Sequence, residues 1–238
     1  MRERGGVWIA HGSGDAERLV VDANDGVMVP PGYPLRRIWL TAGETESYYE
    51  GFANEGLWPL CHVAHVCPVF RPRDWKTYQK INAQFAAAIE QEFPDPSTPV
   101  FIQDYHLALV AASLRKRCSQ VKSALFWHIP WSHPDRLRLC QWRREIMEGL
   151  LANDLLAFQI ELGRRNFVTA ARDELGAEVT RSTVRHKGRL TLVQAVPIGV
   201  DYDRSQQMTT DHSLEADTKR LVAERKIDPE STLGLRLL

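Results

Sequence analysis

Two polar clusters follow apolar runs in this chain, and their side chains could bind or transform a hydroxylated ligand. Asp104 and His106 come two and four residues after the apolar run 99–102, and His128 follows the apolar run 124–127. A carboxylate accepts hydrogen bonds from hydroxyl groups, and an imidazole changes its charge near neutral pH. If both runs are neighbouring strands of a parallel sheet, these side chains meet at its carboxyl edge, where such sheets bind ligands.

Each of these residues also has a purely structural interpretation. Asp104 is well placed to cap a helix that begins at His106, and the spacing alone favours the cap. His128 is surrounded by aromatic residues and could equally be a half-buried histidine bonded to a backbone carbonyl. His106 could be packed in the first helical turn. Trp8 and Trp75 could be core residues, or their flat indole faces could support a sugar ring.

Weaker signals lie elsewhere in the chain. The glycine-rich stretch 11–15 could hold a phosphate through backbone N–H groups, but it matches no P-loop because no GK[ST] follows. Short basic clusters at 36–37, 115–117 and 143–144 are typical of solvated faces and helix ends.

The spacing of apolar residues predicts strands that alternate with helices. Strands are predicted at 7–10, 36–41, 99–102, 123–130, 154–159, 190–199 and 233–238. Helices are predicted at 74–93, with Asp74 as N-cap, and at 106–118, 143–153, 161–175 and 213–225. This alternation indicates an α/β fold, a Rossmann-like, doubly wound and mostly parallel sheet covered by helices on both faces.

Composition narrows the class of protein. The 238 residues carry 30 basic and 30 acidic side chains, so no net field draws the chain to nucleic acid or to an anionic membrane. No apolar segment reaches the ~18 residues of a membrane span, and the N-terminus resembles no signal peptide. The cysteines lack paired CxxC spacing, which predicts reduced thiols in a cytoplasmic protein and no zinc site. They are Cys61, Cys67, Cys118 and Cys140.

Seven stretches together resemble one known family. They are GGVWIAHGSG, YYEGFANEGLWPLCH, DWKTYQKINAQFA, VFIQDYHLALVAASLR, LFWHIPWSHPD, LLANDLLAFQ and VPIGVD. In this order and spacing they are similar to the trehalose-6-phosphate synthase family, retaining glycosyltransferases with the two-Rossmann-domain GT-B architecture. The resemblance covers almost the whole chain, and DYH with HIP is its most specific part.

The resemblance implies transfer of glucose from a nucleoside diphosphate glucose to glucose 6-phosphate, without a metal or a resident cofactor. An N-terminal domain binds the acceptor and a C-terminal domain binds the nucleotide. Asp104 then contacts sugar hydroxyls, and His128 lies beside the donor glucose, where its backbone assists the leaving group. Trp8 and Trp75 line the acceptor pocket. Asp104 and His128 are thus the predicted catalytic residues.

Three departures from the family pattern qualify this expectation. A strand and glycine-rich loop with a phosphate-binding arginine usually precede GGVW, and an R-x-D-Y-[ST]-K-G motif usually follows the last predicted strand. Neither occurs here, so we expect residues 1–238 to form a single acceptor-binding Rossmann-like domain, truncated at both ends, without its first strand and without the nucleotide-sugar domain. We expect such an incomplete half to have little transferase activity alone.

The third departure concerns the acceptor. Many members carry HYR where this chain has His62, Val63 and Ala64, so a phenol that could bond the acceptor phosphate is replaced by an isopropyl group. Glycerol 3-phosphate and a cyclitol, which relatives in the family use as acceptors, therefore remain alternative acceptors for this chain. A non-catalytic sugar-phosphate-binding or regulatory module, a poorly folding gene remnant and a homo-oligomer also stay open.

Overall fold

The computed structural model of the chain describes residues 6–12, 34–92, 98–203 and 206. Residues up to Pro197 belong to one compact unit, and those from Ile198 onward belong to a second. The predicted helix at 213–225, the predicted strand at 233–238 and part of the glycine-rich stretch 11–15 lie outside the described residues. The prediction of one acceptor-binding domain over 1–238 stays a prediction, since few residues of the second unit are described.

The first unit is built around a six-stranded sheet with the order β3-β4-β5-β8-β7-β6. Strands β3, β4, β5 and β8 are parallel neighbours, and β7 and β6 extend the sheet in antiparallel fashion. Their bounds are β3 Val100–Gln103, β4 Ser123–Trp127, β5 Leu155–Phe158, β6 Glu178–Val179, β7 Thr183–His186 and β8 Arg189–Ala195. A separate parallel pair consists of β1 Trp8–Gly12 and β2 Leu35–Trp39.

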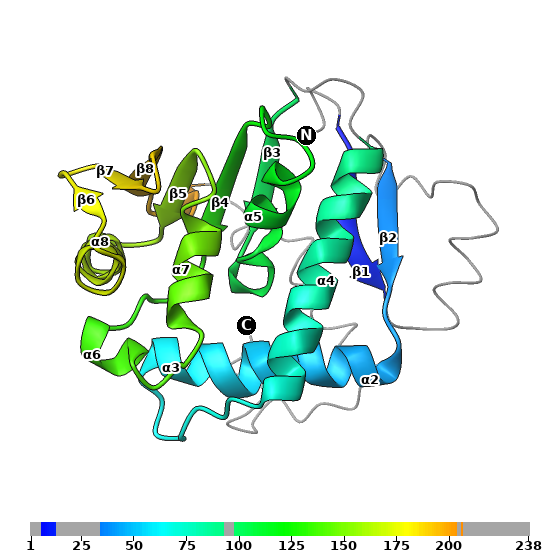
Figure 1. Cartoon of the computed structure of the whole chain (residues 1–238), viewed down its shortest axis with the longest axis horizontal. Helices are drawn as coiled ribbons and strands as arrows, with labels where there is room; N and C mark the ends of the chain where they lie inside the picture. Colours follow the sequence, from blue (N-terminus) through cyan, green and yellow to red (C-terminus); the bar gives the residue numbers. More distant parts are fainter. Residues whose placement is uncertain (1–5, 13–33, 93–97, 204–205, 207–238) are drawn as a thin grey trace. The chain divides into compact units, whose positions relative to one another are not determined.

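Helices connect and flank these strands, and Figure 1 shows α4, α5 and α7 side by side along the sheet. The helical segments are α2 Ala42–Thr45, the π-helix η1 Glu46–Leu57, α3 Trp58–His62, α4 Pro72–Gln91, the 3₁₀ turn η2 Tyr105–Leu107, α5 Val110–Arg115, α6 Pro134–Leu137, α7 Arg143–Leu150 and α8 Glu161–Leu175. The predicted α/β class with a mostly parallel sheet is confirmed. The strands predicted at 99–102, 123–130, 154–159 and 190–199 correspond to the parallel strands β3, β4, β5 and β8. Within the described residues, no helix is long and apolar enough to cross a bilayer.

The helix predicted over 106–118 is interrupted near its start. The chain makes the turn η2 first and begins α5 only at Val110. Asn82 of α4 explains the break, because its amide donates to the carbonyl of His106 and its oxygen accepts the N–H of Leu109, both at 3.0 Å. These backbone groups are satisfied by a side chain, so a regular helix is not required to pair them.

The prediction that Asp74 caps a helix is wrong. The N-cap of α4 is Arg71, and Asp74 is buried in the first turn, bonded to Arg71 at 3.1 Å and to Arg73 at 3.2 Å. A Cβ atom at Gly51 would approach the Asp74 carboxylate to 2.7 Å, so η1 packs directly on this acid. Asp74 therefore joins two helices, a role that local spacing does not reveal.

Candidate active site

Asp104 lies at the carboxyl end of β3 in an unusual backbone conformation. Its φ of 72° is positive, which is uncommon for any residue other than glycine. Its N–H donates to the carbonyl of Phe126 at 2.8 Å, so the bonding between β3 and β4 continues up to this residue. The chain turns sharply out of the sheet here, and such strained residues are concentrated at functional sites.

The Asp104 carboxylate joins the ends of two neighbouring strands. Its Oδ1 accepts the N–H of Tyr105 at 2.8 Å and the N–H of His128, just after β4, at 3.2 Å. The Tyr105 bond caps η2, so the capping interpretation is correct for this short turn. Among the described residues, Oδ2 accepts no hydrogen bond. One oxygen is thus fixed by the backbone, and the other can accept a hydrogen bond from a ligand.

Burial raises the pKa of Asp104 above its usual value, because the charged form is partly removed from water. The two backbone N–H bonds and the charges of His128 and His62 act in the opposite direction and reduce the increase. Asp104 is therefore a partly desolvated acid whose position is determined by hydrogen bonds.

His128 is exposed at the same edge of the sheet. Its Nε2 lies 2.6 Å from Oε1 of Gln103, the last residue of β3, and its ring lies 4.5 Å from that of Phe126. The structural alternative of a half-buried histidine bonded to a backbone carbonyl is not what the structure shows. Asp104 and His128 meet at the carboxyl edge, as the order of the strands predicted.

His106 is partly buried beneath this edge. Its ring stacks on Tyr49 with centroids 4.9 Å apart, and its buried Nε2 has no hydrogen-bond partner within the described part of the chain. Burial, assisted by the charge of His11, lowers the pKa of His106 to about 4. His106 is therefore neutral near pH 7 and packs against the π-helix.

The two tryptophans differ in exposure. Trp8 on β1 is 43% exposed, whereas Trp75 on α4 is 6% exposed. The Trp75 ring stacks on Trp142 at 5.2 Å and lies 5.1 Å from Phe52 and 5.8 Å from Tyr78. An indole enclosed by three aromatic rings has little surface for a sugar. Trp75 is thus packed in the core of this unit, and its predicted contact with the acceptor stays a prediction.

The π-helix contributes contacts that the sequence did not reveal. The hydroxyl of Tyr105 donates to Oδ1 of Asn54 at 3.0 Å, and Tyr49 supports His106. π-Helical segments are often found at functional sites. In the sequence, this element appeared only within the stretch YYEGFANEGLWPLCH of the family resemblance, and neither Asn54 nor Gln103 carried any signal of its own.

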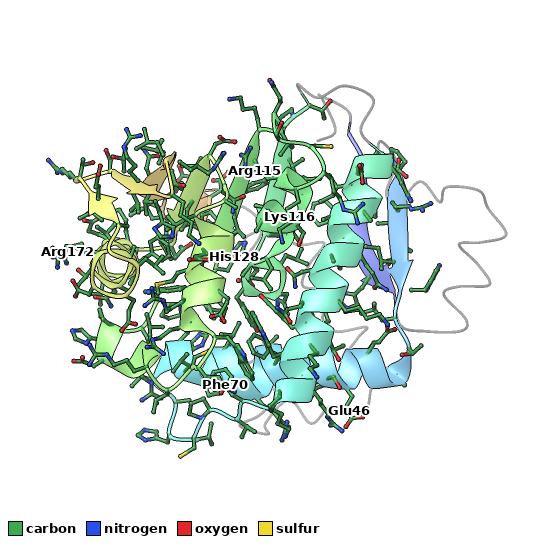
Figure 2. The ribbon with its side chains drawn as sticks, in the orientation of Figure 1. Glu46, Phe70, Arg115, Lys116, His128 and Arg172 are labelled. Atoms are coloured by element: carbon green, nitrogen blue, oxygen red, sulfur yellow. The ribbon has the colours of Figure 1, made fainter. Side chains whose placement is uncertain are left out.

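The basic clusters are engaged in ion pairs. Arg36 lies 3.8 Å from Glu92, Arg115 lies 2.7 Å from Asp154 and Arg143 lies 2.9 Å from Glu174. Arg115, labelled with His128 in Figure 2, bonds to Asp154, which also accepts the N–H of Ser123 at the start of β4, whereas His128 follows the other end of that strand. These arginines stabilise helix and strand ends and do not line the Asp104 edge.

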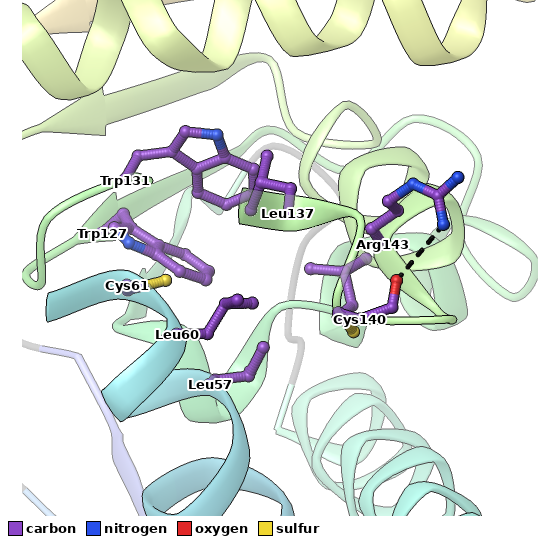
Figure 3. A pocket seen from close by; sticks show the side chains of 9 residues that line it. Leu57, Leu60, Cys61, Trp127, Trp131, Leu137, Cys140 and Arg143 are labelled. Atoms are coloured by element: carbon purple, nitrogen blue, oxygen red, sulfur yellow. Dashed lines mark hydrogen bonds between the residues drawn. The ribbon is translucent and has the colours of Figure 1, made fainter. Parts of the chain in front are cut away.

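Two hollows are associated with the loop after β4. The enclosed one in Figure 3 has a volume of about 10 Å³ and an apolar lining that includes Trp127 and Leu60, so it is too small for a sugar. Burial raises the pKa of its two thiols, Cys61 and Cys140, to about 12. The second hollow, of about 80 Å³, lies against His128 and the start of α8. Its position at the carboxyl edge makes it the better candidate for ligand contact.

Comparison with known proteins finds relatives that match almost the whole chain. The trehalose-6-phosphate synthases of Mycobacterium ulcerans and Mycolicibacterium smegmatis are each 32% identical over 233 residues, which is 94% of this chain. The alignments cover 46% and 45% of those proteins, so the chain spans about half the length of the curated relatives it matches.

Solved structures show the same fold. A UDP-forming α,α-trehalose-phosphate synthase from Burkholderia xenovorans, in complex with glucose-6-phosphate, is 26% identical with a TM-score of 0.72, covering 84% of this chain and 44% of that one. The apo structure of OtsA, at 22% identity, has a TM-score of 0.78 over 88% of this chain and 46% of that one. The model of glycosyltransferase family 20 matches residues 5–228. This chain therefore belongs to glycosyltransferase family 20.

Proposed function

We propose that this chain forms the acceptor-binding half of an α,α-trehalose-phosphate synthase, which transfers glucose from a nucleoside diphosphate glucose to glucose 6-phosphate. The observation that carries the proposal is the Asp104 carboxylate, whose Oδ1 is held by the N–H groups of Tyr105 and His128. A carboxylate with one oxygen fixed and the other available is suited to orient the hydroxyls of a sugar.

We assign roles to the residues at this edge as follows. Asp104 orients sugar hydroxyls, and His128 contacts the transferred glucose through its ring or its backbone. Trp8, with 43% of its surface exposed, offers an indole face to the acceptor. Retaining transfer through an oxocarbenium-like state builds negative charge on the leaving diphosphate, which cations stabilise. We assign that task to the half of the family's proteins that this chain does not span.

A cytoplasmic location belongs to the same proposal. All four cysteines are free thiols, and two of them are buried. Free thiols are typical of proteins that work in a reducing compartment.

Calorimetry with glucose 6-phosphate on the whole chain tests the proposal. We expect Asp104→Asn to weaken binding by about tenfold, because an amide accepts hydrogen bonds from hydroxyls less strongly than a carboxylate does. Asp173→Asn on α8 is the matched control, since Asp173 is paired with Arg172 and should leave affinity unchanged. A folded chain that binds no glucose 6-phosphate, or an Asp104→Asn variant with full affinity, would show that the proposal is wrong.

One observation favours an acceptor other than glucose 6-phosphate. Val63 is 59% exposed and carries no group that could donate a hydrogen bond to a phosphate. The same titration with glycerol 3-phosphate and with a cyclitol therefore compares the candidates. Tighter binding of either compound than of glucose 6-phosphate would assign the chain to a relative with that acceptor.

A further inference from the structure

The segment 128–136, which follows β4, contacts two separate parts of the first unit. At its start, the N–H of His128 donates to Asp104. At its end, Ser132 and Arg136 donate to the C-terminus of α3, where His62 and Val63 lie. One short segment therefore connects the carboxylate at the end of β3 with the turn that follows α3.

Arg136 makes most of the second set of contacts. Its Nε donates to the carbonyl of Leu60 at 3.0 Å, and its Nη2 donates to the carbonyls of Pro59 at 3.2 Å and Ala64 at 3.5 Å. Ser132 Oγ adds a bond of 2.6 Å to the carbonyl of Leu60. The last carbonyls of a helix lack intrahelical partners and carry partial negative charge, so a guanidinium is well matched to them.

The turn that Arg136 holds is strained. Val63 has φ 54° and ψ 38°, the left-handed conformation, which is rare for a β-branched residue. Its side chain is 59% exposed, so little apolar packing compensates for the strain. Such a conformation persists when the surrounding structure restrains it, and the Arg136 bonds on both sides of Val63 provide that restraint.

The held turn is connected to Asp104 by a short stretch of chain: the N–H of His128 donates to Asp104, and Ser132, four residues later, donates to the carbonyl of Leu60 at 2.6 Å. In agreement with this connection, the charge of His62 opposes the increase that burial causes in the pKa of Asp104. His62 is also fixed on its own helix, because its ring stacks on Trp58 at 4.1 Å and its Nδ1 lies 3.0 Å from the Trp58 carbonyl. Its place relative to Asp104 thus follows from where the end of α3 is held.

We propose that Arg136 is a positioning residue for sugar-phosphate binding: through the carbonyls of Pro59, Leu60 and Ala64 it holds the His62–Ala64 turn beside Asp104. The role in ligand binding rests on the proposed function, whereas the positioning of the turn does not. A hydroxylated, anionic ligand suits this pair of groups, because a carboxylate accepts hydrogen bonds from hydroxyls and an imidazole can donate one to an anion.

The first test is calorimetry with glucose 6-phosphate on the whole chain and four variants. We expect Arg136→Ala to weaken binding by about tenfold, and Arg136→Lys and Ser132→Ala to weaken it less, because each keeps some of the bonds to α3. Arg138→Ala is the matched control, since Arg138 pairs with Asp135 and Glu174 and does not contact α3. Full affinity in folded Arg136→Ala and Arg136→Lys chains would overturn the proposal.

The second test needs no ligand, so it separates failure of this inference from failure of the proposed function. The pKa of Asp104 is measured by carboxyl ¹³C NMR with and without His62→Gln, in the native chain and in the Arg136 variants. With Arg136 present, removing His62 should raise the pKa of Asp104, because a favourable positive charge is lost.

In the Arg136→Ala chain that increase should disappear, since His62 is no longer held in place. An equal increase in both backgrounds would overturn the proposal even if glucose 6-phosphate binds. Arg136→Lys keeps the charge but cannot span three carbonyls, so it should show a reduced increase. That variant keeps the test decisive if Arg136→Ala does not fold.

Discussion

Asp104 combines a structural role with the binding role that we propose for it. Its Oδ1 caps η2 and joins the ends of β3 and β4, so removing the acceptor would leave two backbone N–H groups without their bonds. Burial raises its pKa, which means that the native chain holds the ionised form less favourably than the unfolded chain does. The bonds stabilise the fold, whereas the charge opposes it.

Replacing Asp104 with Asn separates these two effects. The pKa of Asp104 is higher in the folded chain than its usual value. The free energy of unfolding therefore falls as the pH rises from the usual pKa of an aspartate through the native pKa. Asp104→Asn keeps an acceptor oxygen and removes this decline, so its stability should equal or exceed that of the native chain near pH 7. Urea unfolding from pH 4 to 7 measures the difference. If the variant is less stable at pH 7 than the native chain, the ionised Asp104 does not lower the stability of the fold.

At the scale of elements, two helices end in the same left-handed conformation with different residues. The helix α3 ends at Val63 with φ 54°, and α8 ends at Gly176 with φ 64°. Glycine reaches this conformation without steric cost, whereas a β-branched residue does not. The end of α8 is thus a relaxed helix terminus, and the end of α3 is held by its surroundings.

Opposite substitutions at the two helix ends should have opposite effects. We expect Val63→Gly to raise the free energy of unfolding by about 0.5–1 kcal/mol, because it relieves the strain. Gly176→Ala should lower it by about 1 kcal/mol, since a Cβ there meets no atom within 4 Å and the cost is conformational alone. Chemical denaturation of both variants checks this. Destabilisation by Val63→Gly would show that the turn is not strained.

At the scale of the whole sheet, the two edges of the first unit serve different purposes. The carboxyl edge carries Asp104 and His128, whereas the amino ends of β4, β5 and β8 are fastened by Asp154. Its carboxylate accepts the N–H of Ser123 at 2.9 Å and bonds of 2.7 Å from Arg115 and Arg189. Figure 1 shows that these strands are neighbours, so one acid stabilises three of them.

Asp154→Asn should therefore affect stability and not ligand binding. Partial burial raises the pKa of Asp154, but the Ser123 bond and the charges of Arg115 and Arg189 outweigh it and leave the pKa below its usual value. Its stabilisation is present above that usual value and is lost as pH falls through the lowered native pKa.

We expect a loss of about 2 kcal/mol at pH 7 that shrinks in acid, as measured by urea unfolding. Asp173→Asn, which breaks only an exposed pair with Arg172, should change stability by less than about 0.5 kcal/mol. Weaker glucose 6-phosphate binding in the Asp154→Asn chain would contradict the separation of the two edges.

The sequence by itself determined the class of fold and the edge that carries the site. Alternation of apolar runs and helical spacing is local information, so α8 was predicted with its observed bounds and β3, β4 and β5 within a few residues. Because parallel strands place their carboxyl ends together, Asp104 and His128 could be predicted to meet from strand order alone. The resemblance of seven stretches to one family agrees with the family model that matches residues 5–228.

Only the tertiary structure decided what each side chain does. Trp75 became a core residue because aromatic rings enclose it, and His106 became partly buried because its ring stacks on Tyr49. The helix after Asp104 was interrupted because Asn82 satisfies its backbone groups. The antiparallel β6 and β7 were missed because short strands are stabilised by their neighbours. The contacts of Arg136 join residues more than seventy positions apart, and no local pattern of residues encodes such a distance.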